Sequence, residues 1–174
     1  MNIVNLAANG IKQNGHPDIS TIMKYHPEVL TSLAILCHRR GLESGWIGTS
    51  DTPDFIVSGY RDHDPDPAVK NSPHAFGLAV DLMVSPKDAH VPQNRPEILD
   101  AQISWITDAI ESNLFYRAGI YPEQNTIHLD LCDVSWRNAY NGTPFWVKWQ
   151  GTYHGFTVLN EAVSFAKQMI QSKG

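Results

Sequence analysis

Two short apolar runs of this chain carry ionisable residues at their centres. Of all the sequence features, these two runs constrain the fold most strongly. The run LAVDLMV (78–84) contains Asp81, and the run TIHLDL (126–131) contains His128 and Asp130. Successive side chains of a strand point to opposite faces, so each run separates its polar residues from its apolar ones. An unpaired buried carboxylate is costly, so these polar groups need partners. The runs therefore predict two strands with an apolar core face and a shared polar face.

Three further segments have the apolar spacing of amphipathic helices. The first lies within 26–42, where Pro27 is near the start and Gly41 follows the end. The second covers about 96–113 and the third 159–170. Shorter elements are expected as helices within 2–23 and as strands at 54–58, 118–121 and 127–132.

The length and composition favour one globular domain over residues 1–174. Of the 174 residues, 42% are apolar and 18% charged, which excludes a disordered or fibrous chain. Helices and antiparallel-looking strands in one chain predict an α+β fold, a single compact domain with a small antiparallel sheet packed by helices. The formal charge of −5 argues against a general binder of nucleic acid or of anionic membranes.

The two cysteines and the N-terminal sequence carry further expectations. Cys37 and Cys132 lie in apolar runs, so we expect buried free thiols rather than a disulfide framework. The N-terminal residues show no basic region followed by an apolar one, so no signal peptide is expected. No apolar run reaches the roughly 20 residues that a membrane span needs. We therefore expect synthesis in a cytoplasm.

Three residues have the chemistry of a catalytic metal site. His74 and Asp81 are seven residues apart, and His128 follows Asp81 by 47. Two imidazoles and one carboxylate supply the three protein ligands that a catalytic zinc takes, and this ligand type favours zinc over other divalent metals. Such a set leaves the metal positive enough to polarise a carbonyl and acidify water. Taken singly, His74 would be a surface-turn histidine and Asp81 a charge at a strand end.

The order of short motifs resembles a known peptidase family. SGYR (58–61) is followed by the SxHxxGxAxD pattern (72–81) and by HxD (128–130). Over about 29–136, this order resembles the zinc D-Ala-D-Ala carboxypeptidases, a family that includes the L-alanyl-D-glutamate endopeptidases of phage endolysins. The resemblance implies one zinc ion bound by His74, Asp81 and His128.

The resemblance also implies how substrate is bound. Arg61 would hold the substrate carboxylate or polarise its carbonyl, a task that suits a permanently charged guanidinium. Ser72 would hydrogen-bond the substrate near the metal, and Tyr60 of the SGYR motif would also bind substrate. A salt bridge from Arg61 to the Asp-rich loop at 62–66 is the structural alternative. Trp136, Trp146 and Trp149 could line a substrate groove, although core and lid packing is the more common use of such residues.

The general base is the point at which the chain departs from the family. Many members carry Asp or Glu three residues before the last histidine ligand, and this chain has Asn125 there. An amide cannot take a proton from water at neutral pH. Glu123 is our preferred candidate, and Asp130 is an alternative.

Two functions follow as expectations. The first is a zinc metallopeptidase that cleaves a peptide bond in peptidoglycan stem peptides, either as a carboxypeptidase or as an endopeptidase. Its partner would be peptidoglycan or a D-amino-acid-containing peptide, and its source a phage or a bacterium that lyses or remodels cell walls. The second is a non-catalytic zinc-binding domain, for example a virion component, which Asn125 favours.

Overall fold

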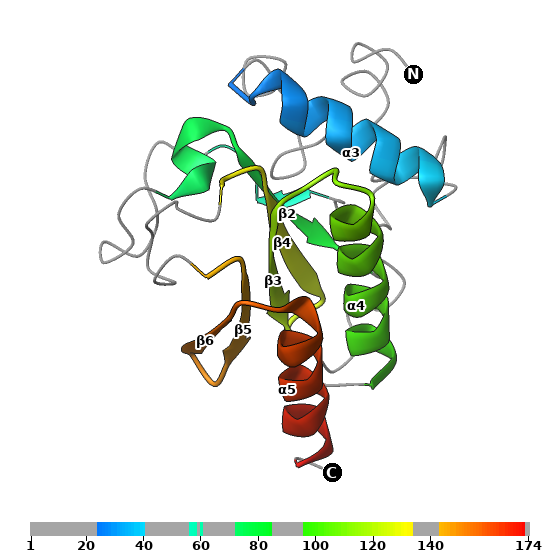
Figure 1. The fold of residues 1–174 in the computed structure, drawn as a ribbon, viewed down its shortest axis with the longest axis vertical. Coiled ribbons are helices and arrows are strands. Elements are labelled where there is room, and N and C mark those ends of the chain that lie inside the picture. Colours follow the sequence, from blue (N-terminus) through cyan, green and yellow to red (C-terminus); the bar gives the residue numbers. More distant parts are fainter. Residues whose placement is uncertain are drawn as a thin grey trace.

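The computed structural model describes residues 24–40, 56–58, 60, 72–84, 96–133 and 143–172 (Figure 1). In chain order the elements are α3 (Pro27–Arg39), β1 (Ile56–Ser58), the 3₁₀-helix η1 (Pro73–Phe76), β2 (Ala79–Met83), α4 (Pro96–Glu111), β3 (Arg117–Tyr121), β4 (Thr126–Asp130), β5 (Phe145–Trp149), β6 (Thr152–Phe156) and α5 (Leu159–Gln171).

The strands form one six-stranded sheet in the order β1-β2-β4-β3-β5-β6. Every neighbouring pair is antiparallel except β3 and β5, which run parallel. β2 and β4 are joined in a register that places Asp81 opposite His128. β4 in turn pairs with β3, where His128 lies opposite Gly119. The centre of the sheet thus brings together residues that are far apart in the sequence.

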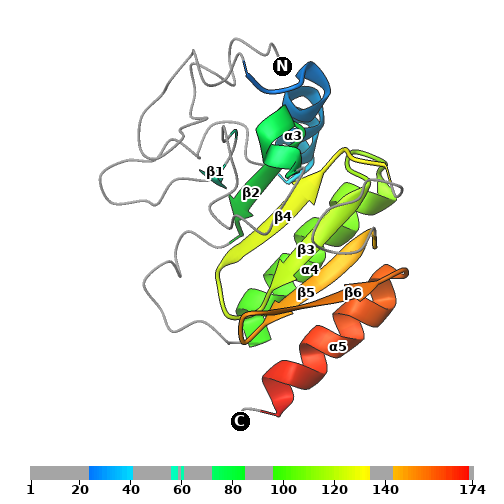
Figure 2. The same cartoon turned by 90° about the vertical axis from the view of Figure 1, so that its left-hand side faces the viewer.

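Helices cover the apolar face of this sheet. α4 packs on β3 and β4, α5 packs on β5 and β6, and the two helices contact each other (Figures 1 and 2). α3 is tied to α4 by an ion pair between Arg39 Nη2 and Asp108 Oδ1, 2.8 Å apart. The core contains the alternate residues of the central strands, which are Val80, Leu82, Ala118, Ile120, Ile127, Leu129 and Val147. Burial of this face leaves the opposite face for the polar residues of the same strands.

The predicted α+β class is confirmed, as are the three amphipathic helices and the strands around Asp81 and His128. The expectation of a wholly antiparallel sheet is wrong for β3 and β5. The chain leaves β4 at the end of the sheet where β3 begins, and it enters β5 from that same end. β5 therefore runs in the direction of β3.

Smaller differences concern element ends and two missed strands, β5 and β6. The helix expected at 96–113 ends at Glu111, and Asn113 has a positive φ of 54°. Neither β5 nor β6 was expected; they pair through a tight turn in which Gln150 and Gly151 both have positive φ. The short helices expected within 2–23 lie outside the described residues. Of the strand expected at 54–58, the described part is β1.

Both cysteines are buried free thiols, as expected. Burial raises the pKa of Cys37 to about 12, so this thiol is protonated at neutral pH. Among the described helices, none combines the length and the apolar character of a membrane span.

Candidate metal centre

His74 is held in place by the turn that follows it. η1 carries this residue and is followed by its C-cap Gly77, whose positive φ of 68° suits glycine. A Cβ at this position would collide with the carbonyl oxygen of Lys24. The Gly77 carbonyl accepts a hydrogen bond from the backbone N–H of His26 at 2.9 Å, just before α3. The tight turn therefore fixes η1 against the start of α3, and with it the backbone of His74.

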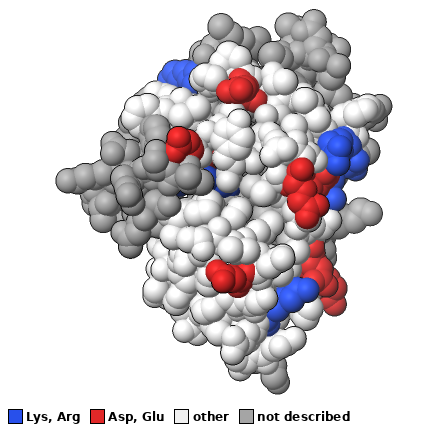
Figure 3. Space-filling model, in the orientation of Figure 1, with Lys and Arg blue, Asp and Glu red and all other residues white. Residues whose placement is uncertain are grey.

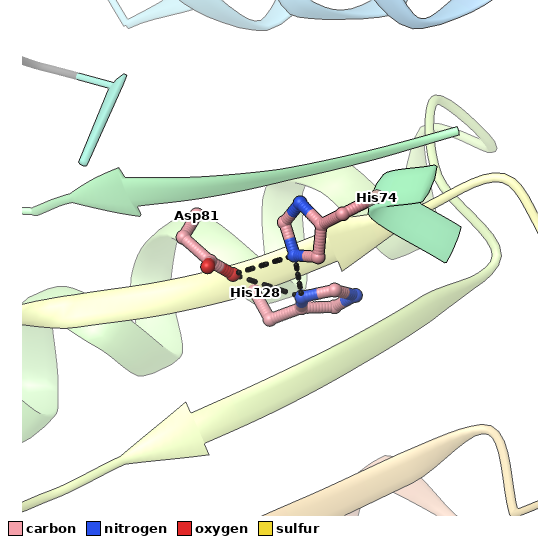
Figure 4. A group of neighbouring side chains, drawn as sticks. All are labelled: His74, Asp81 and His128. Carbon is pink, nitrogen blue, oxygen red and sulfur yellow. Dashed lines mark hydrogen bonds and ion pairs between the residues drawn. The ribbon is translucent and has the colours of Figure 1, made fainter. Parts of the chain in front are cut away.

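The side chains of His74, Asp81 and His128 converge on one point (Figure 4). His128 Nδ1 lies 2.8 Å from Asp81 Oδ1 and 3.2 Å from His74 Nε2. His74 Nε2 lies 3.4 Å from Asp81 Oδ1. The three predicted ligands, from η1, β2 and β4, are thus brought together by the fold.

The spacing of the three donor atoms fits a metal ion. A tetrahedral zinc with bonds of about 2.0–2.2 Å separates its ligand atoms by about 3.3 Å, close to the separations found here. Two imidazoles and a carboxylate are also ligands that zinc accepts. The two histidine side chains are buried, whereas that of Asp81 is 20% exposed. Solvent therefore reaches the trio at the carboxylate. The group can hold a metal ion, and its donors fit zinc.

The second ring nitrogen of His128 faces another carboxylate. His128 Nε2 lies 3.0 Å from Asp130 Oδ2. Asp130 Oδ1 accepts a hydrogen bond from the backbone N–H of Cys132 at 2.9 Å and lies 3.2 Å from Nε of Arg117. The Asp130 carboxylate is thus held on the side of the His128 ring that faces away from the three metal-ligand atoms. This position differs from the one expected for a general base, because its carboxylate supports a ligand instead of facing the open side of the site.

Trp146 of β5 forms a wall beside His128. The two ring centroids are 5.0 Å apart, and the guanidinium of Arg117 lies 5.5 Å from the Trp146 ring. Trp146 Nε1 donates a hydrogen bond to the hydroxyl of Tyr121 at 3.3 Å. Trp146 is fully buried. Its packing against a ligand imidazole favours the structural interpretation over the substrate groove.

The trio is electrostatically coupled in the absence of a metal. Burial acts to raise the pKa of Asp81, but the two histidines hold it well below its ordinary value. Burial of the His128 ring lowers its pKa, but the hydrogen bonds to Asp130 and Asp81 outweigh this and raise it to about 9. In the metal-free protein, a proton on His128 therefore compensates part of the negative charge that a cation would otherwise neutralise.

The other predicted site residues that the structure describes are not part of the group formed by His74, Asp81 and His128. Ser72 is buried at the start of η1, two residues before His74, and Tyr60 is half-buried. Arg61 lies outside the described residues. Glu123 lies in the turn between β3 and β4, and its Oε2 accepts a hydrogen bond from the backbone N–H of Gln150 at 2.7 Å.

Glu123 lines a small pocket away from the donor group. The other lining residues are Tyr121, Gln124, Lys148 and Gly151. The structure does not bring Glu123 into the group formed by the three metal donors. Asn125, at the usual base position, is buried.

Arg117 is the site residue that sequence reasoning missed. The strand was expected to start at Ala118, which left Arg117 outside it. A signal was present: β3 and β4 are joined by a short turn, and continuing their pairing from Tyr121 and Thr126 places Arg117 opposite Asp130.

Comparison of the chain with family models, with curated proteins and with solved structures finds no match. On the face drawn in Figure 3, the Lys and Arg side chains of the described residues are scattered among Asp and Glu and form no single basic patch.

Proposed function

We propose that this chain is a zinc-dependent peptidase that hydrolyses a peptide bond in peptidoglycan stem peptides, as a D-Ala-D-Ala carboxypeptidase or as an endopeptidase. The observation that carries the proposal is the convergence of His74 Nε2, Asp81 Oδ1 and His128 Nδ1 within 3.4 Å of one another. The motif order that resembles cell-wall peptidases supplies the substrate class. Action in cell-wall lysis or remodelling by a phage or a bacterium belongs to the same proposal.

The chain's own residues divide the work between holding the metal and binding substrate. When bound, zinc would act as a Lewis acid toward the scissile carbonyl and toward water. His74, Asp81 and His128 would hold it, and because only Asp81 is negative the centre keeps a net positive charge. Arg61 is proposed to bind the substrate carboxylate, and Ser72 and Tyr60 are proposed to contact the substrate as well. Substrate would approach from the Asp81 side, where the trio meets solvent.

Glu123 remains the proposed general base, and its present contact sets the condition for that role. To accept a proton at the metal centre, its carboxylate would have to leave the Gln150 N–H. A Glu123→Gln variant tests the assignment, because an amide cannot act as the base. Turnover equal to that of the unsubstituted chain would remove Glu123 from the mechanism.

A second candidate function is a metal-binding domain without catalysis, for example a structural part of a virion. Two observations favour it: Asn125 occupies the usual base position, and Glu123 is hydrogen-bonded to a turn. In this case the metal would serve stability or binding only.

One experiment separates the two candidates. Purified peptidoglycan and a D-Ala-D-Ala peptide are incubated with the zinc-loaded chain, with and without a chelator. Hydrolysis that the chelator abolishes and zinc restores is the expected result. His74→Ala should lose both zinc and activity. His154→Ala is the matched control, because His154 packs on Phe165 and lies outside the trio, and it should keep both. Stoichiometric zinc without cleavage of either substrate would favour the non-catalytic domain.

A further inference from the structure

A chain of buried polar side chains leads from His128 away from the three donor atoms. It passes from His128 Nε2 to Asp130 Oδ2 over 3.0 Å, and from Asp130 Oδ1 to Arg117 Nε over 3.2 Å. Both Asp130 and Arg117 are 0% exposed, so neither charge is solvated by bulk water. Their positions follow from strand pairing, since Arg117 of β3 lies directly opposite Asp130 of β4.

Burying the ion pair of Asp130 and Arg117 costs free energy unless other contacts compensate for the lost hydration. Removing two charges from water costs several kcal/mol per ion, which their mutual attraction only partly repays. Additional contacts reduce the cost here: the Cys132 N–H bonds Asp130, and the Arg117 guanidinium lies over the Trp146 ring. The pair occupies the polar face of the sheet, and its carboxylate points at a ligand imidazole. This placement links the pair to the donor group.

The consequence for His128 is a defined choice of ligand nitrogen. A carboxylate is an acceptor, so the nitrogen that faces Asp130 carries the ring proton. The other nitrogen, Nδ1, faces Asp81 Oδ1 and His74 Nε2. A metal bound among these three atoms would replace the proton on Nδ1 and leave the proton on Nε2 with Asp130. Metal-ligating histidines commonly donate their second N–H to a carboxylate in this way.

We infer that Asp130 and Arg117 are positioning residues of the metal centre. Asp130 fixes His128 so that Nδ1 is its ligand atom, and Arg117 holds the Asp130 carboxylate in the orientation that this requires. The inference rests on the metal centre of the proposed function and not on peptidase activity. It gives a positioning role to Asp130, which was expected as an alternative general base, and to Arg117, which was not expected at the site.

The first test uses the unsubstituted full-length chain. Long-range proton–nitrogen correlation NMR of the imidazole rings, with and without zinc, reports which nitrogen carries the metal and which the proton. We expect zinc on Nδ1 of His128, with the proton on Nε2, and zinc on Nε2 of His74. Zinc on Nε2 of His128 would overturn this inference alone. A chain that takes up no zinc would instead overturn the metal centre itself, together with this inference.

The second test measures zinc affinity by competition with a chromophoric chelator. Asp130→Asn should weaken zinc binding by about 10–100-fold, the usual effect of losing such a partner. Because it leaves Arg117 buried opposite a neutral side chain, the double variant Asp130→Asn/Arg117→Met is made as well. The double variant should be more stable than Asp130→Asn yet bind zinc no better. If it regains the affinity of the unsubstituted chain, the pair is structural only.

A matched control separates positioning from general loss of stability. Ile106→Val shortens a fully buried side chain of α4 in the core, on the other face of the sheet from the donors. It should lower the melting temperature and leave zinc affinity unchanged. If Ile106→Val weakens zinc binding as much as Asp130→Asn does, the positioning role is refuted.

Discussion

Gly119 lies directly beneath the indole of Trp146, and a Cβ on this glycine would occupy the space of the indole nitrogen and its neighbouring ring carbons. The two residues are paired across the parallel strands β3 and β5. Gly119 is also paired with His128 on its other side. The missing side chain therefore lets the indole extend over β3 and reach the imidazole of a metal ligand.

Gly119→Ala should destabilise the fold and disturb the metal centre. The added methyl must displace Trp146 or shift the strands, and overpacking of this kind costs about 1–3 kcal/mol. Displacement of the indole removes the wall beside His128, so zinc affinity should fall together with the melting temperature. Thermal unfolding, tryptophan fluorescence and zinc titration measure the three effects.

A double-mutant cycle provides the control for this contact. Trp146→Leu removes the ring that the methyl would meet, so the additional cost of Gly119→Ala should be smaller in that background. Equal costs in the two backgrounds would show that the Gly119–Trp146 contact does not limit this position.

Gly77→Ala should weaken metal binding through η1. The substitution imposes a positive φ on alanine and drives its Cβ against the Lys24 carbonyl, so η1 and His74 must move. Gly151→Ala is the matched control, because Gly151 also has positive φ but its Cβ would meet open space. Both variants should lose about 1–2 kcal/mol from the backbone conformation alone, and only Gly77→Ala should reduce zinc affinity in a competition titration.

The stability of the metal-free protein should fall as the pH rises from about 6.5 to about 9. The folded-state pKa of His128 is raised to about 9 from an ordinary value of 6.5. The protonated ring therefore stabilises the fold fully below pH 6.5, and this contribution, as much as about 3 kcal/mol, is lost as the proton leaves. Melting temperatures in the presence of a chelator measure the effect. His128→Ala should flatten the profile over this window.

Zinc affinity should rise over the same pH window. Zinc takes the place of the His128 proton, so binding releases that proton and strengthens by up to tenfold per pH unit. Isothermal titration calorimetry in buffers of different ionisation enthalpy counts the protons released. A zinc affinity independent of pH between 6.5 and 9 would contradict the raised pKa.

Zinc should raise the melting temperature, and a chelator should reverse the change. A ligand that binds only the folded state stabilises it by about 4 kcal/mol at a thousandfold excess over its dissociation constant. Differential scanning fluorimetry with increasing zinc measures the shift. His128→Ala should abolish it and His154→Ala should retain it. A shift that survives His128→Ala would place the bound metal elsewhere.

The sheet around the trio could be predicted because the polar residues of β2 and of β4 all fall on one face of their strand. Polar positions within LAVDLMV and TIHLDL identified the faces of β2 and β4, and the register then brought Asp81 opposite His128. The pairing of β5 with β3 could not be predicted, because the alternation of polar and apolar residues within a strand does not indicate which strand lies next to it. The parallel pairing depends instead on the end of the sheet from which the chain returns.

The supporting residues were harder to predict than the ligands. The surroundings of Glu123 depend on the β5–β6 turn, and the segment TYHGF of β6 lacks the alternation that would have indicated a strand. Arg117 lies at the first position of β3, where a boundary error of one residue removed it from the polar face.

The strand order predicts different rates of amide hydrogen exchange for the central strand β4 and the edge strand β6. β4, which carries His128 and Asp130, is hydrogen-bonded to a neighbour on each side, whereas β6 forms an edge and contains no buried residue. Amide exchange is slowest where opening requires the whole sheet to separate, and fastest at edges that fray alone. We therefore expect the amides of β4, beneath the donor group, to exchange more slowly than those of β6, which can fray while His128 and its carboxylate stay in place.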